Sequence, residues 1–203
     1  MSNILNAISR LESYLARERS DFFNALLPGL TIPKIDSLVS GFPFRLPLEA
    51  YELYQWRNGM NIEVIDHLSF RFYPNSSFFS PLDFCVRDYE MFMKLKTLSD
   101  MDDEQFNSRW FPLISFDQTY SLIIGSAVQQ MTTEIVSIIT HDDWVVDPSY
   151  ESLTAQLLTI TECLEEGVYY LDDEGDFQSE ATREEEIHRK YNPSDRYNEI
   201  RIV

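Results

Sequence analysis

The residues with the clearest chemical potential lie together at Thr140-His141-Asp142-Asp143-Trp144, directly after an apolar run that predicts a strand. A histidine beside two carboxylates could hold a divalent metal or act as a general base at a strand end. Neighbouring side chains on an extended segment point to opposite faces, so three adjacent residues seldom converge on one ion. The spacing therefore favours a solvated hairpin end, and we expect no metal site there.

Other motifs that could do chemistry are weak. The acidic run from Asp172 to Asp176 is similar to a calcium loop, but its glycine is in the wrong place and no distal bidentate glutamate follows. Cys85 and Cys163 are far apart in sequence and predict two reduced thiols in or near the core. The chain has no glycine-rich phosphate loop and no nucleophile elbow. We expect a protein without cofactor or catalysis, although a hydrolase whose carboxylates meet only in the fold stays an alternative.

The net charge of −18 is unevenly distributed along the chain. Residues 1–96 carry 11 acidic and 10 basic side chains, whereas residues 97–203 carry 23 acidic and 6 basic ones. An acidic surface argues against binding to nucleic acid or to anionic lipid, because both need basic residues. It favours a basic protein partner through long-range attraction, although acidic residues can also serve solubility alone.

Hydrophobic periodicity predicts an α+β fold with a mainly antiparallel sheet flanked by helices. Helical spacing is found at residues 3–26, 35–40, 44–59, 82–95 and 152–164. Strand-like runs are found at residues 62–65, 69–73, 111–116, 121–125, 134–140, 144–146 and 169–171. The gaps between residues 111 and 146 are short, which favours an antiparallel meander over parallel crossovers. We expect a single domain over residues 1–171, followed by a charged C-terminal tail over residues 172–203 with one amphipathic turn around Ile187.

The stretch from Phe44 to Gly59 predicts a short helix on which the fold is organised. Leu46, Ala50, Leu53 and Tyr54 share one face of it. Pro47 suits the first turn, and the pair Asn58-Gly59 suits a helix end. This pattern predicts a packing role.

The order of these elements resembles that of the SUKH superfamily, which contains bacterial immunity proteins and Smi/Knr-like regulators of fungal cell-wall assembly. The resemblance covers residues 32–165. It rests on the following motifs: Leu46-Pro47 opening a helix that ends in Asn58-Gly59, the strand Trp110-Phe111-Pro112-Leu113-Ile114-Ser115-Phe116, the strand Leu122-Ile123-Ile124-Gly125, the strand Ile135–Ile139, and a helix from Ser152-Leu153 through Leu164. The chain departs from the pattern in its long N-terminal helix, its charged tail, and Asp117-Gln118-Thr119, where the pattern has a glycine-aspartate turn.

The resemblance implies a non-enzymatic binding role, because many bacterial members are thought to neutralise toxins, often nucleases, by binding them. An acidic surface suits that role, since a cleft that attracts phosphates also attracts carboxylates. An intracellular regulatory or scaffold protein with another partner is the alternative. No apolar run is long enough to cross a bilayer and the N-terminus lacks a signal-peptide pattern, so we expect a cytoplasmic protein.

Five residues are predicted to contact the partner. Asp142, Asp143, Glu165 and Glu166 flank predicted elements in the acidic half. Trp56 is an aromatic residue of the type enriched at interfaces, unless it covers a neighbouring helix instead.

Overall fold

The computed structural model describes residues 3–61, 78–116, 119–140, 145–173 and 177–197. Its helices are α1 (Asn3–Glu18), α2 (Ser20–Ala25), α3 (Ile32–Val39), α4 (Leu48–Trp56), α6 (Leu82–Leu98), α7 (Leu153–Glu165), α8 (Ala181–Tyr191) and the 3₁₀ turn η1 (Asp195–Tyr197). Its strands are β1 (Leu26–Pro28), β2 (Arg57–Met60), β3 (Phe78–Phe79), β4 (Trp110–Phe116), β5 (Thr119–Ile124), β6 (Ile135–Ile139), β7 (Val145–Tyr150), β8 (Tyr169–Leu171) and β9 (Phe177–Ser179). The α+β class is confirmed.

The main sheet has the order β3-β4-β5-β6-β7, and every neighbouring pair is antiparallel. The meander predicted for residues 111–146 is therefore confirmed. Two further two-stranded sheets pair β1 with β2 and β8 with β9. The predicted strands 62–65 and 69–73 lie outside the described residues.

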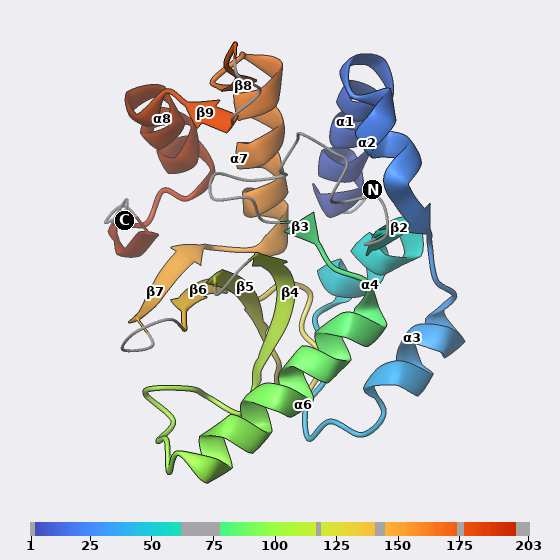
Figure 1. Ribbon diagram of the computed structural model, residues 1–203, viewed down its shortest axis with the longest axis vertical. Coiled ribbons are helices and arrows are strands. Elements are labelled where there is room, and N and C mark those ends of the chain that lie inside the picture. Colours follow the sequence, from blue (N-terminus) through green and yellow to red (C-terminus); the bar gives the residue numbers. More distant parts are fainter. Residues whose placement is uncertain (1–2, 62–77, 117–118, 141–144, 174–176, 198–203) are drawn as a thin grey trace.

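The two faces of the main sheet bury different clusters of apolar side chains. Phe111, Ile123 and Tyr150 belong to the large core that also contains the buried sides of α1, α4 and α7. Leu122 and Ile138 face the other way and form a small core with Phe92 of α6 and Phe106. This alternation follows from the two-residue period of a strand. Figure 1 shows α6 beside the sheet in the lower half of the molecule and α1, α7 and α8 in the upper half.

The α4 helix begins later than the sequence predicts. Pro47 is its N-cap residue and the helix ends at Trp56, while Asn58 and Gly59 belong to β2. Gly59 does adopt a left-handed φ of 74°, as the sequence suggested for a helix end, but it does so inside a strand. Ala50, Leu53 and Tyr54 of α4 are buried, as predicted, and Leu46 is buried just before the N-cap of the helix.

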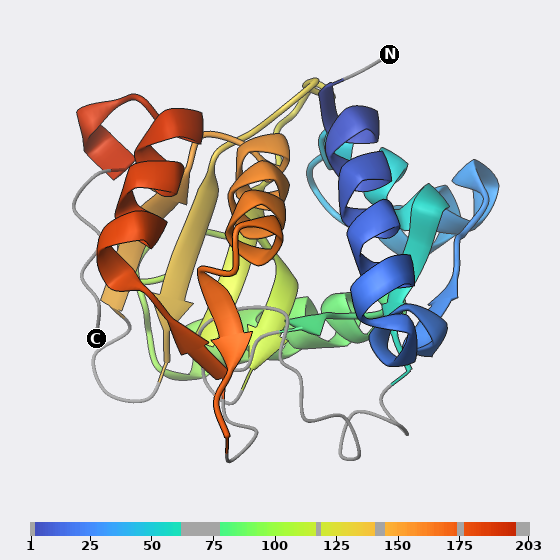
Figure 2. The same ribbon diagram turned by 90° about the horizontal axis from the view of Figure 1, so that it is seen from above.

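The C-terminal part contains more regular structure than the sequence predicted. Instead of one turn around Ile187, the chain forms the eleven-residue helix α8, which packs against α7. Figure 2 shows α7 between α1 and α8. Ile187, His188 and Asn192 are buried.

No helix of the described residues is both long and apolar enough to cross a membrane.

Candidate protein-binding site

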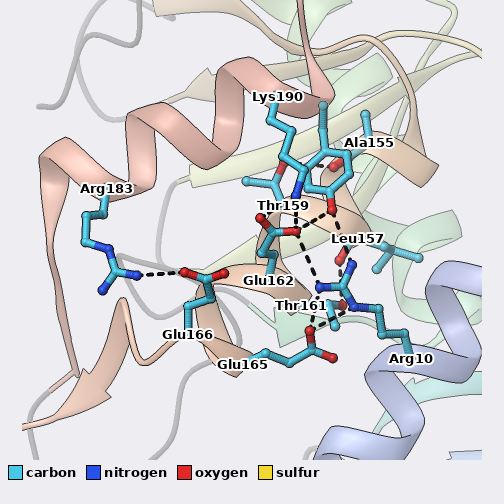
Figure 3. A network of polar contacts seen from close by, with 11 residues as sticks. Arg10, Ala155, Leu157, Thr159, Thr161, Glu162, Glu165, Glu166, Arg183 and Lys190 are labelled. Carbon is cyan, nitrogen blue, oxygen red and sulfur yellow. Dashed lines mark hydrogen bonds and ion pairs between the residues drawn. The ribbon is translucent and has the colours of Figure 1, made fainter.

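Two of the predicted partner-binding carboxylates, Glu165 and Glu166, lie at the C-terminal end of α7 and form ion pairs within the molecule. Glu165 accepts hydrogen bonds from Nε of Arg10 at 2.8 Å and from its Nη2 at 2.5 Å. Glu166 pairs with Nη2 of Arg183 at 2.7 Å (Figure 3). The first pair joins α7 to α1, and the second joins it to α8. Both carboxylates have a role in the chain's own packing, and their assignment to a partner-binding surface stays a prediction.

Glu162 lies at the centre of the same polar network (Figure 3). Its side chain accepts from Nζ of Lys190 at 2.6 and 2.7 Å and from the hydroxyl of Tyr191 at 2.5 Å. Burial would raise the pKa of Glu162, but the hydrogen bonds from Lys190 and Tyr191 outweigh it and lower that pKa below its ordinary value. The network therefore holds α8 on α7 most firmly while Glu162 is ionised.

Trp56 is the last residue of α4 and is half-buried against the large core. Its Nε1 has no hydrogen-bond partner among the described residues. The guanidinium of Arg57 lies 6.0 Å from the centre of its ring. Trp56 thus covers part of the core, and only a fraction of its ring is available to a partner.

Asp142 and Asp143 lie outside the described residues. In the sequence they follow Thr140, the last described residue after β6.

A carboxylate with an unusual environment is Glu49, in the first turn of α4. It is only 4% exposed, and its Oε1 accepts hydrogen bonds from the backbone N–H, at 3.3 Å, and the hydroxyl of Thr154. Thr154 is in the first turn of α7, so Glu49 satisfies the N-terminal end of α7 rather than that of its own helix. Burial raises the pKa of Glu49. Because it is closed to solvent, its carboxylate serves packing rather than chemistry on a dissolved substrate.

The C-terminal segment is held on the end of β7 by His188 and Asn192. The Nε2 of His188 lies 2.8 Å from the carbonyl oxygen of Ser149, which can only accept, so Nε2 carries the proton. The side-chain oxygen of Asn192 accepts from the backbone N–H of Glu151 at 2.9 Å. The Nδ1 of His188 is buried without a partner in the described part of the chain, and the ring lies 4.9 Å from that of Tyr150. Burial, with the nearby charge of Arg189, lowers the pKa of His188.

We expect this histidine to make the free energy of unfolding fall as the pH is lowered from about 7 to about 5. The unfolded chain takes up a proton near the ordinary pKa of 6.5, whereas folded His188 resists it, so the unfolded state binds more protons in this interval. His188→Gln keeps a donor for Ser149 and does not titrate. Urea unfolding at the two pH values measures the change. The free energy of unfolding should fall less for the variant than for the wild type, since the titration of the carboxylates is common to both proteins. An equal fall in both proteins would contradict a lowered pKa for His188.

A row of exposed apolar side chains lies on α6. Met91, Leu95 and Leu98 follow each other at helical spacing and are 43%, 37% and 72% exposed. The buried side of the helix is formed by other residues, Leu82, Cys85, Tyr89 and Phe92. Apolar side chains therefore occupy two faces of α6, and only one of them packs in the core. Exposed apolar residues that share one face mark an interaction site more often than scattered ones do.

The end of α6 places a further methionine beside this face. Asp100 has a left-handed φ of 52°, and the N–H of Met101 donates to the carbonyl of Lys96 at 3.0 Å. This hydrogen bond across the helix end turns the chain back toward the last turn of α6. The Nζ of Lys96 then ties the following loop to the helix, by donating to the carbonyl of Phe106 at 2.5 Å and by pairing with Asp103.

These features enclose an open groove of about 400 Å³, here called the α6 groove. Its lining consists of Met91, Phe92, Leu95, Ser99, Met101, Gln105, Tyr120 and Thr140. Phe92 and Tyr120 meet edge to face, with ring centres 4.8 Å apart. The groove thus lies on the side of the sheet that carries the small core.

The loop that borders the groove is strongly acidic. Residues 99–105 contain four acidic residues and no basic one. Asp103 pairs with Lys96, whereas Asp100, Asp102 and Glu104 are exposed and form no ion pair with another described residue. One oxygen of Asp102 accepts from the backbone N–H groups of Glu104 and Gln105, both at 2.9 Å, which fixes the loop. A methionine- and leucine-lined surface with exposed carboxylates at its border suits a basic, partly apolar protein partner.

The sequence predicted a helix over residues 82–95 but not the groove beside it. The structure extends this helix to Leu98 and buries Leu82, Cys85, Tyr89 and Phe92. The available signal was a second stripe at Met91, Leu95 and Leu98, with the i, i+4, i+7 spacing of another face.

The described residues contain no group of three or more histidine, cysteine or carboxylate side chains that could hold a metal ion. Cys85 and Cys163 are free and buried, as the sequence predicted, and burial raises the pKa of each thiol to about 12. Both thiols are therefore unreactive at neutral pH. No protein-family model matches the chain, and no curated protein matches it.

Proposed function

We propose that this chain is a non-enzymatic protein-binding domain of the immunity type, which neutralises a basic toxin by occupying part of its surface. The observation that carries the proposal is the α6 groove, where exposed apolar side chains lie beside three carboxylates that make no ion pair with another described residue. A binding surface needs apolar anchors for affinity and polar groups at its border for specificity.

The charge of the chain supports a basic partner. Its net charge of −18 attracts a positive protein from a distance and raises the rate of encounter. A nuclease is one such partner, since it holds phosphates with lysine and arginine. The order of motifs that resembles the SUKH superfamily supports the same role. A regulatory partner that is not a toxin would use the same surface, so the two roles must be separated by experiment.

The test is a neutralisation assay with the product of a neighbouring gene that encodes a toxin. The purified toxin is titrated with the chain, and toxic activity and complex formation are followed together. We expect activity to be lost as the molar ratio approaches one, with a complex of the two proteins by size-exclusion chromatography. A complex that leaves the activity intact would favour the regulatory role. An acidic partner, or no complex, would contradict the proposal.

A further inference from the structure

The α6 groove has a shape and chemistry that restrict what can occupy it. Its apolar side chains come from α6 (Met91, Phe92 and Leu95), from the loop residue Met101, and from the ring of Tyr120. Leu98, 72% exposed, extends the helix face beyond the groove. We propose that the groove binds an amphipathic α-helix of a partner protein, with an apolar stripe on one side and lysine or arginine next to it. This inference rests on the proposed protein-binding function and specifies the partner's contact segment.

The backbone of α6 favours a helical partner over an extended one. The N–H and C=O groups in the interior of α6 are bonded within the helix, so this side of the groove has no strand edge to pair with. An extended segment lying on it would bury backbone groups without partners, which is costly. A helix satisfies its own backbone and presents only side chains. The groove is therefore suited to helix packing rather than strand addition.

The length of the apolar face matches short helical anchors. From Met91 to Leu98 the face spans eight residues of helix, or seven rises that add up to about 10 Å. Anchors at i, i+4 and i+7 of a partner helix span the same distance and could lie along it. Met91 and Met101 are flexible and polarisable, so they can adapt to leucine, methionine or aromatic anchors.

The acidic residues at the border of the groove determine which charge the partner helix should carry beside its apolar anchors. Asp100, Asp102 and Glu104 are exposed on the loop at the C-terminal end of α6. A second copy of this chain is a poor occupant, because each copy carries a net charge of −18. A basic partner is favoured, because lysine or arginine beside its apolar anchors would face these carboxylates.

The probe is a synthetic peptide of about 18 residues, made of leucine and lysine with leucine at helical spacing. A scrambled peptide of the same composition, without an apolar face, is its control. The full chain is labelled at the methionine methyl groups, which gives reporters inside and outside the groove. Met91 and Met101 line the groove, whereas Met60 is buried in the large core and Met131 is 62% exposed elsewhere.

Two sets of variants test the apolar and charged parts separately. Met91→Gln with Leu98→Gln removes two of the three exposed apolar side chains of α6. Val128→Gln with Met131→Gln is the control, at exposed apolar residues of the β5–β6 connection. Asp100→Asn, Asp102→Asn and Glu104→Gln remove three charges while keeping side-chain oxygens, and asparagine tolerates the left-handed backbone at residue 100. Asp173→Asn, Glu186→Gln and Asp195→Asn remove the same charge from exposed positions of the C-terminal region, whose helix α8 lies away from α6 (Figure 1).

We expect the helical peptide to shift the methyl signals of Met91 and Met101 and to leave those of Met60 and Met131 in place. Each groove variant should weaken binding about tenfold, whereas each control set should change it less than about threefold. Equal binding of the scrambled peptide, shifts centred outside the groove, or no binding would overturn the proposal. Concentration-dependent shifts of Met91 and Met101 without peptide would also overturn it, by showing that the groove is a contact between copies. A chain that neutralises its toxin but fails these tests keeps the proposed function and uses another face.

Discussion

Replacing Gly59 by alanine is expected to destabilise the fold by at least about 3 kcal/mol. Gly59 has a φ of 74°, which costs an alanine free energy by itself. A Cβ atom there would also lie 2.3 Å from the backbone nitrogen of Pro81 and 2.4 Å from the carbonyl carbon of Ser80. The close approach of Gly59 to Ser80 and Pro81 also places Asn58 at the start of α6. There the side-chain oxygen of Asn58 accepts from the N–H of Leu82 at 3.0 Å and caps the helix. Urea unfolding measures the change.

Two other glycines separate the contributions of strain and crowding. Gly167 has a similar φ of 68° but open space around it, so Gly167→Ala should cost only about 1–2 kcal/mol. Gly41 has neither feature, and Gly41→Ala should change stability by less than about 0.5 kcal/mol. If Gly59→Ala were no worse than Gly167→Ala, the close packing of β2 against the start of α6 would be wrong.

Leu53→Ala is expected to cost about 2–5 kcal/mol, since it removes a buried side chain from the large core. Leu53 is 2% exposed and lies on the face of α4 that also buries Ala50 and Tyr54. The hydroxyl of Tyr54 donates to the carbonyl of Ser80 at 3.2 Å, so this face is also fixed to the start of α6.

The matched control for this change is Leu98→Ala on α6, at a leucine that is 72% exposed. We expect it to change the free energy of unfolding by less than about 0.5 kcal/mol. A loss below that value for Leu53→Ala would show that α4 is peripheral and is not the element on which the fold is organised.

The parts of the fold that the sequence predicted are those specified by neighbouring residues. The meander follows from apolar runs with short gaps, which leave few pairings other than antiparallel ones. The α7 helix is bounded by local signals: Ser152 accepts from the N–H of Ala155 at 3.0 Å, and Gly167 provides a left-handed residue after the helix end.

The parts that the sequence did not predict depend on contacts between distant residues. Helix α8 carries many charges, and its stability on α7 comes from Glu162, Lys190 and the buried His188, whose partners lie far away in the chain. The same holds for Glu165, which faces Arg10 across 155 positions of sequence. No local pattern shows that these carboxylates are already paired, so they resembled a free acidic surface.

The α6 groove could not be predicted from the sequence either, because it also depends on contacts between distant residues. A sequence pattern shows that α6 has apolar residues, but the packing decides which of its faces stays exposed. Phe92 packs with Phe106 in the small core, whereas Leu95, three positions later, remains 37% exposed. Exposure of the second stripe is thus a property of the assembled fold.

The association rate of the chain with its basic partner, measured at low and at physiological salt, shows whether the acidic loop beside the α6 groove belongs to the binding surface. Screening shortens the reach of charges to about 8 Å at physiological ionic strength, so the rate should fall as salt is added. The triple variant at Asp100, Asp102 and Glu104 should associate several-fold more slowly than the wild type at low salt, and the control triple at Asp173, Glu186 and Asp195 should lose much less. An association rate that is indifferent to salt, or an equal loss in both triple variants, would contradict an acidic binding surface at the α6 groove.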